Sequence, residues 1–119
     1  MKDFRSLKVW QKSHQLSLSV YKATRDFPKD ELYGLTNQIR RASASIGANI
    51  AEGCGKDSDA ELRRYLLIAM GSSSEQENYL LLARDLEHLE NTEYEVLQKE
   101  LVELRKMMNA FIQKLKANR

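Results

Sequence analysis

The stretch from Gly34 to Gly55 restricts the fold of this chain more than any other part of the sequence. Its large apolar residues recur at spacings of four, seven and four residues, which places them on one stripe of a helix: Leu35, Ile39, Ile46 and Ile50. Most residues between them are Ala, Ser or Gly, so neighbouring helices can approach this helix closely. An adjacent arginine pair, Arg40 and Arg41, lies near its start. The stretch therefore predicts the central helix of an all-helical domain, with a basic patch attached.

This central helix is predicted over residues 32–53, and it is one of four. Apolar residues at helical spacing predict the other three over residues 4–25, 58–88 and 92–117. The last of them has the clearest periodicity, because its apolar residues alternate spacings of three and four in a heptad-like seam: Tyr94, Leu97, Leu101, Leu104, Met108, Phe111 and Leu115. Four helices with short connections predict an all-α, antiparallel up-down-up-down four-helix bundle, in a single domain that spans residues 1–119.

Local signals predict where these helices begin and end. Pro28 disfavours helical geometry at the residue before it, and Asp30 can then cap the second helix. Gly53 and Gly55, on either side of Cys54, are expected to end that helix, because glycine readily adopts the left-handed conformation. Ser58 has Glu61 three residues beyond it, which is the spacing of a capping box at the start of the third helix. The run GSSS at residues 71–74 is expected to be a second close-contact zone within that helix, which faces the small residues of the second helix.

The composition is that of a globular protein. Of the residues, 42% are hydrophobic and 30% are charged, and the formal net charge is only +2. The basic excess lies in residues 1–64, which hold 12 Lys and Arg against 8 Asp and Glu, whereas the remainder holds 7 against 9. The only cysteine, Cys54, excludes an internal disulfide. Since the sequence also shows no signal peptide and no membrane-spanning run, a cytoplasmic location without membrane contact is expected.

Basic residues of the first half are candidates for binding nucleic-acid phosphate. The planar guanidinium group of arginine can bind phosphate at two points, and clustered cations strengthen the local field. The alternative is that one arginine pairs with an acidic residue of a neighbouring subunit while the others are solvated. Adjacent helix positions point about 100° apart, so two neighbouring arginines cannot both face one partner squarely. The candidate residues are Arg40, Arg41, Lys56, Arg63 and Arg64.

A second set of residues is a candidate for contacts between helices or between subunits. It combines small residues, an aromatic anchor and two acidic residues that fall within the small-residue zones. For these two carboxylates, burial beside an arginine or a backbone cap is preferred over a paired carboxylate site, because unpaired buried charge is costly. The set is Trp10, Ala42, Ser45, Gly47, Ala51, Glu52 and Glu75.

No catalytic, metal or cofactor site is expected. A di-iron site in a four-helix bundle needs Glu-x-x-His on two helices, whereas the nearest sequence, Asp85-x-x-His88, occurs once and begins with aspartate. The other histidine, His14, lies on an apolar stripe and is expected to be a hydrogen-bonded structural residue. Because neither a nucleophile with a matching base nor a phosphate-binding loop can be identified, enzymatic activity is not expected.

Several motifs resemble those of one bacterial family. In chain order they are FRSLKVW at 4–10, FPK at 27–29, YGLTNQIRRA at 33–42, SI at 45–46, NIAEG at 49–53 and GSSSE at 71–75. With these motifs the chain resembles the four-helix-bundle proteins first noticed as open reading frames inside intervening sequences of 23S rRNA genes, which are often filed under a ribosomal-protein heading. The accessory variability determinant (Avd) of diversity-generating retroelements belongs to the same group.

The resemblance implies a four-helix bundle that assembles into a homopentamer and carries a basic surface suited to nucleic acid. For the retroelement members it also implies association with a reverse transcriptase. Two functional hypotheses therefore stay open. The first is a non-enzymatic oligomer that binds RNA or DNA through a basic surface. The alternative is a protein-interaction scaffold, for example an accessory subunit that docks a reverse transcriptase without touching nucleic acid.

Overall fold

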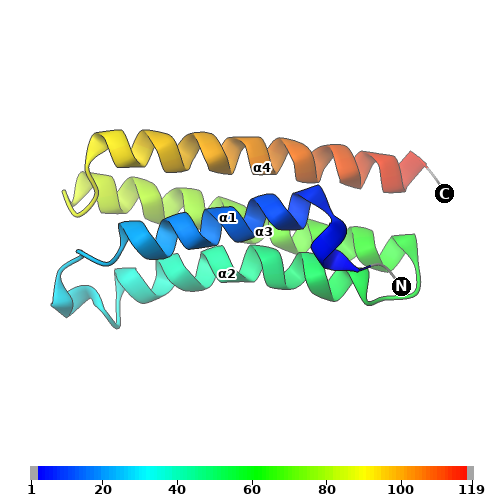
Figure 1. The fold of residues 1–119 in the computed structure, drawn as a ribbon, viewed down its shortest axis with the longest axis horizontal. Coiled ribbons are helices and arrows are strands. Elements are labelled where there is room, and N and C mark those ends of the chain that lie inside the picture. The colour runs from blue at the N-terminus through cyan, green and yellow to red at the C-terminus, as the bar shows by residue number, and fades with distance from the viewer. Residues whose placement is uncertain (1–2, 118–119) are drawn as a thin grey trace.

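The computed structural model describes residues 3–117, and within this range it shows four α-helices and no strand (Figure 1). Each helix runs antiparallel to the one before it, and the fourth closes the bundle by packing against the first (Figure 1). The predicted up-down-up-down bundle is therefore confirmed. The helices are α1 (Lys8–Ala23), α2 (Leu35–Cys54), α3 (Asp59–Asp85) and α4 (Asn91–Ala117).

The predicted first helix is too long at both ends. Asp3 caps a short 3-10 helix, η1 (Phe4–Ser6), by accepting a hydrogen bond from the backbone N–H of Arg5 at 3.0 Å. The backbone at Leu7 is extended, so α1 begins only at Lys8. A second short 3-10 helix, η2 (Lys29–Glu31), lies between α1 and α2.

The predicted cap at the start of the second helix is wrong. Asp30 lies in η2, and the residue that precedes α2 is Gly34, which has no side chain to act as a cap. The predicted stop at Gly53 and Gly55 is confirmed in position, since α2 ends at Cys54 and Gly55 follows as its C-cap, but no glycine of residues 3–117 has the expected positive φ. At the next helix, the Ser58 Oγ accepts a hydrogen bond from the backbone N–H of Glu61 at 3.1 Å, which confirms that predicted cap.

The third helix ends three residues earlier than predicted, in a hydrogen-bonded reversal. Glu87 has a φ of 64°, in the left-handed region that a non-glycine residue seldom adopts. The backbone N–H of His88 then bonds to the carbonyl of Ala83, and that of Glu87 bonds to the carbonyl of Arg84. This is the pattern of a Schellman motif, which satisfies the last carbonyls of α3 and turns the chain toward α4.

The core is built from one stripe of each helix. In α4 the buried residues follow the predicted seam with one change: Ile112 is 3% exposed, whereas Phe111 is only partly buried beside the core. The predicted α4 begins one residue late, since the helix starts at Asn91. The core stripe of α2 is confirmed as Leu35, Ile39, Ile46 and Ile50, all of which are buried.

Small residues allow α2 to pack closely on both neighbours, as predicted. Toward α1, the Ser43 Oγ donates a hydrogen bond to the Ser17 Oγ at 2.9 Å. Toward α3, the hydroxyls of Ser45 and Ser72 lie 2.9 Å apart. The predicted contact zone in α3 is confirmed for Ser72, but it is wrong for Gly71, which is exposed and where an added β-carbon would meet no other atom within 4 Å.

Gly53 marks the tightest approach of α3 to the backbone of α2. A β-carbon at this position would lie 2.9 Å from the Cβ of Tyr65 and 3.0 Å from the Cδ1 of Leu62. Distances this short require the two helices to move apart. Glycine is therefore needed here for helix packing and not for its backbone freedom.

We expect Gly53→Ala to lower the free energy of unfolding by about 1–3 kcal/mol, because the added methyl group overpacks the contact between α2 and α3. The matched control is Gly71→Ala, which we expect to raise it by about 0.5–1 kcal/mol, since alanine favours the helix and its methyl group meets nothing there. Urea unfolding of both variants measures the change. A Gly53→Ala protein as stable as the unmodified chain would contradict the close packing.

Candidate nucleic-acid interface

The two adjacent arginines of α2 lie in different environments. Arg40 is half-buried, and its Nε donates a hydrogen bond to the Thr24 Oγ1 at 2.9 Å. Its guanidinium group also lies 4.8 Å from the ring centroid of Tyr21. Arg41 is exposed and forms no ion pair or hydrogen bond with the described residues. Arg40 therefore ties α2 to the end of α1, and only Arg41 is available to a ligand.

The segment that joins α2 to α3 is not a basic patch. The Lys56 Nζ and the Arg64 guanidinium lie 5.5 Å and 4.6 Å from the ring centroid of Tyr65. The Arg64 Nε also pairs with the Glu61 carboxylate at 2.9 Å. Two further acidic residues, Asp57 and Asp59, lie in the same segment, so its charges largely cancel.

The five predicted phosphate-binding residues do not form one surface. Arg40 and Lys56 are sixteen residues apart, which corresponds to about 24 Å along a helix axis. Arg41 thus lies in the first half of α2, whereas Lys56, Arg63 and Arg64 lie near the other end of the bundle. The five candidates are therefore not gathered into one patch, and phosphate contact by any one of them stays a prediction.

Arg63 lies on the edge of α3 that faces α4. Further along this edge, Glu77 accepts hydrogen bonds from Gln98 at 2.6 Å and from Arg105 at 2.9 Å, both on α4. Arg63 precedes Glu77 by fourteen residues, or about four helical turns, so it lies on the same edge and level with the last turns of α4. Its side chain is half-buried, and its Nε is buried without a hydrogen-bond partner among the described residues.

The structure brings Arg63 together with basic residues that the sequence reasoning missed. After Glu103, α4 contains no acidic residue, and its exposed Lys106, Lys114 and Lys116 form no ion pair with the described residues. Lys116 follows Gln98 by eighteen residues, which is five turns, so it lies on the edge that faces α3.

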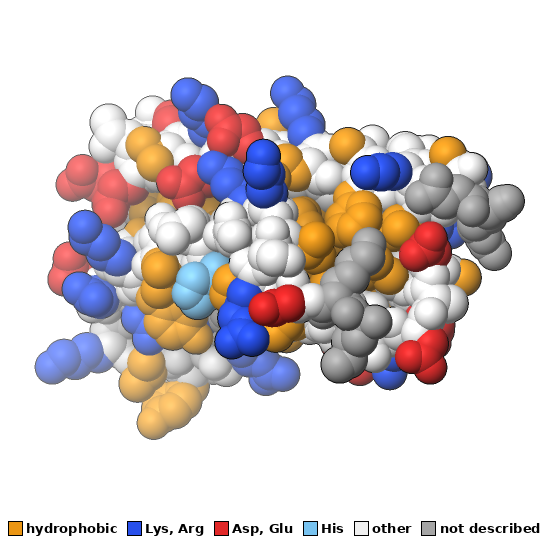
Figure 2. All heavy atoms as spheres, turned by 45° about the vertical axis from the view of Figure 1, so that its right-hand side comes forward, with side chains coloured by type: hydrophobic (Ala, Val, Ile, Leu, Met, Phe, Trp, Pro, Cys, Tyr) orange, Lys and Arg blue, Asp and Glu red, His pale blue; other side chains and the backbone are white. Residues whose placement is uncertain are grey.

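Lys8 completes this group from the start of α1. Lys8 and Lys114 line opposite sides of a hollow between α1 and α4, whose floor is apolar. We refer to the whole group as the α4 basic surface: Lys8, Arg63, Lys106, Lys114 and Lys116. The face drawn in Figure 2 shows Lys and Arg side chains interspersed with Asp and Glu side chains and with exposed apolar side chains.

A signal for the α4 basic surface was present in the sequence. The acid-free run from Leu104 onward contains Arg105, Lys106, Lys114 and Lys116 within the described residues. Counting charge over the two halves of the chain concealed it, because the first half of α4 is acidic and cancels the second. Only Arg105 of this run forms an ion pair with a described carboxylate, that of Glu77 at 2.9 Å.

Most of the predicted contact residues lie at helix–helix contacts within the chain. Ala42 is buried, while Trp10, Ser45, Gly47 and Ala51 are half-buried between helices. A β-carbon on Gly47 would lie 3.1 Å from the Ser13 Oγ and 3.6 Å from the Trp10 Nε1, so this glycine lets α1 pack closely. Their role between subunits stays a prediction.

The two acidic members of that set are not buried, contrary to expectation. Glu52 is exposed near the end of α2, and Glu75 is exposed in the middle of α3. His14 is also exposed and has no hydrogen bond with the described residues, because its ring instead stacks on Trp10 with 4.8 Å between centroids.

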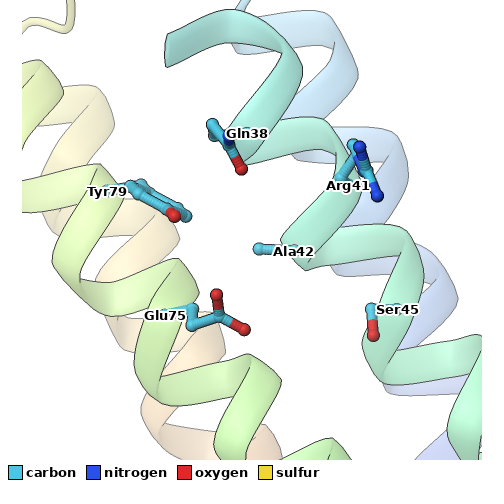
Figure 3. A pocket seen from close by; sticks show the side chains of 6 residues that line it. All are labelled: Gln38, Arg41, Ala42, Ser45, Glu75 and Tyr79. Carbon is cyan, nitrogen blue, oxygen red and sulfur yellow. The ribbon is translucent and has the colours of Figure 1, made fainter. Parts of the chain in front are cut away.

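Glu75 lies beside a polar hollow between α2 and α3 (Figure 3). The hollow has a volume of about 320 Å³ and is lined by Gln38, Arg41, Ala42, Ser45, Glu75 and Tyr79. Arg41 and Glu75 do not pair with each other across it.

Within residues 3–117, no group of three or more His, Cys, Asp or Glu residues is placed to hold a metal ion. No helix of this range is long and apolar enough to cross a membrane.

We expect Arg40→Ala to lower the free energy of unfolding by about 1–2 kcal/mol, because it removes a charged hydrogen bond and leaves the buried Thr24 hydroxyl without its donor. Arg41→Ala is the matched control, and its effect should stay within about 0.5 kcal/mol, since Arg41 is exposed and unpaired. Urea unfolding compares the two. Equal effects would contradict the different roles assigned to these arginines.

Comparison with known proteins agrees with this fold. A family model described as 23S rRNA-intervening sequence protein matches residues 5–110. A solved structure from Bacteroides thetaiotaomicron, described as a protein with unknown function from the S23 ribosomal protein family, is similar with a TM-score of 0.81 and 26% identity, over 88% of this chain and 95% of that one. A search of the curated proteins found no match. The chain belongs to the family of 23S rRNA-intervening sequence proteins.

Proposed function

We propose that this protein is a non-enzymatic, oligomeric four-helix bundle that binds RNA or DNA through the α4 basic surface. One observation carries the proposal: five cationic side chains surround an acid-free part of α4, and none of them forms an ion pair with a described carboxylate. The description of the family and that of its structural neighbour support a connection with RNA, since one refers to 23S rRNA and the other to a ribosomal protein family.

The arrangement suits a phosphate backbone better than a single small anion. Lys8 and Lys114 lie on the α1 side of α4, and Lys116 and Arg63 lie on the α3 side. Lys106 is exposed at a hollow that Met70 of α3 also lines. Cations spaced in this way can follow successive phosphates, and each phosphate that is neutralised releases counterions from the nucleic acid. Binding is then driven largely by electrostatics and depends steeply on salt.

We expect the affinity for duplex DNA or structured RNA to fall on the order of several hundredfold between about 50 and about 200 mM salt, if all five cations contact phosphate. Lys114→Ala should weaken binding and reduce the slope of log K against log salt by about one. Lys99→Ala is the control, because Lys99 lies in the acidic half of α4. Fluorescence anisotropy measures both, and the absence of binding at low salt would exclude the proposed function.

A specific observation also favours the second candidate function, a protein-interaction scaffold. Gly71 is exposed in the middle of α3, where glycine costs about 1 kcal/mol relative to alanine, and no contact within the chain requires it. Exposed apolar residues precede and follow it in the chain, namely Leu67, Ile68, Leu81 and Leu82 of α3 and Leu86, the C-cap residue of α3. A glycine among apolar side chains lets another helix approach closely, either from a second copy or from a partner such as the reverse transcriptase that the resemblance implies.

If the outer face of α3 is an interface between copies, light scattering at micromolar concentration should give a mass several times the 13.8 kDa of the monomer. Gly71→Leu should then shift the protein toward the monomer without unfolding it, because the larger side chain blocks the approach. Gly71→Ala adds only a methyl group and tests whether that small increase already weakens the association between copies. A monomeric mass for the unmodified chain would contradict the oligomeric part of the proposal.

A further inference from the structure

We propose that the hollow between α2 and α3 binds an unpaired guanine nucleotide. The site is separate from the α4 basic surface, so it extends the proposed function without depending on it. The hollow is lined by Gln38, Arg41, Ala42 and Ser45 of α2 and by Glu75 and Tyr79 of α3. Gln38 and Ala42 extend from α2 toward α3, while Glu75 and Tyr79 extend from α3 toward α2 (Figure 3).

The polar groups of this hollow are available to a ligand. The side chains of Gln38, Arg41, Glu75 and Tyr79 form no hydrogen bond or ion pair with the described residues. The adjacent Ser45 differs, because its hydroxyl is already engaged with Ser72. A donor amide, a guanidinium, a carboxylate and a phenol therefore line one hollow, and none of them uses its hydrogen-bonding capacity with the described residues.

The carboxylate of Glu75 selects the base. An ionised carboxylate only accepts hydrogen bonds, and its two oxygens match two parallel N–H donors. On its Watson–Crick edge, guanine presents such a pair, from N1–H and from the exocyclic amino group at C2. Adenine and cytosine present one amino donor beside an acceptor nitrogen, and uracil presents one N–H between two carbonyls. Recognition of the Watson–Crick edge requires that the base be unpaired.

The size of the hollow admits a single base. Ala42, only 7% exposed, is the smallest residue that lines it. Tyr79 is half-buried with its side chain packed against the core, and its exposed part lines the hollow, where a base can contact it. The volume of about 320 Å³ is at the lower end of the range for ligand pockets, which suits one nucleotide and not a helix.

The two remaining polar residues can bind other parts of the nucleotide. The amide of Gln38 can donate a hydrogen bond to the O6 carbonyl of guanine, which neither adenine nor cytosine can replace with an equivalent acceptor. Arg41 is exposed at the rim of the hollow, where its guanidinium can bind the phosphate at two points. A zwitterionic amino acid could also engage Arg41 and Glu75, and displacement of the bound nucleotide by a free amino acid tests that alternative.

The experiment titrates the full chain by calorimetry with guanosine monophosphate and with adenosine monophosphate. It repeats the titration with two short single-stranded oligonucleotides that differ only by a guanine or an adenine. We expect the guanine form to bind about tenfold or more tightly in at least one pair. The pair that shows the preference distinguishes a free nucleotide from a base within a strand.

Variants test whether the hollow is responsible for the preference for guanine. Glu75→Gln should abolish the preference for guanine, since the amide offers one donor and one acceptor, and Ala42→Leu should remove binding by filling the space. Asp85→Asn is the control, because it removes a carboxylate from the end of the same helix, outside the hollow. Lys114→Ala should leave binding of the mononucleotide unchanged, so this proposal and that of the α4 basic surface can fail separately.

Equal binding of guanine and adenine in both pairs would overturn the proposal. A preference for guanine that survives Glu75→Gln would also overturn it, as would displacement of the bound nucleotide by a free amino acid at a similar concentration. Because Glu75 is exposed and unpaired, its replacement leaves the fold intact, which circular dichroism can verify.

Discussion

The structure depends on the close approach of α1 and α3 to the backbone of α2. At Gly53 and Gly47 the neighbouring helices come so near that a β-carbon would touch them. Pairs of serine hydroxyls, such as Ser45 with Ser72, replace larger side chains between these contacts. Because so little volume separates these helices, small residues dominate the contacts of α2 with its neighbours.

The same packing creates the hollow between α2 and α3. Ala42 is buried at this hollow, Glu75 extends into it from α3, and Arg41 lies at its rim on α2 (Figure 3). Arg40, one position earlier, falls on the opposite side and is held by Thr24 and Tyr21 of α1. Arg40 and Arg41 thus make different contacts, because adjacent positions on a helix point about 100° apart.

The helix dipole accounts for part of the α4 basic surface. Cations near the C-terminus of a helix interact favourably with its dipole, which contributes to the placement of Lys114 and Lys116. That effect is confined to the last turn, so it does not account for Lys106 or for Arg63 on the neighbouring helix. The convergence of cations from three helices favours an external anion as their partner.

The sequence by itself determined the four helices, the core stripe of α2 and the bundle topology, since helical periodicity and short connections leave few other arrangements. It also predicted the Ser58 cap, which depends only on local spacing. Tertiary structure alone decided why Gly53 is glycine, which arginine is free, and which cations lie together. Those outcomes depend on how helices far apart in the sequence face one another, and neither local propensity nor charge counting contains that information.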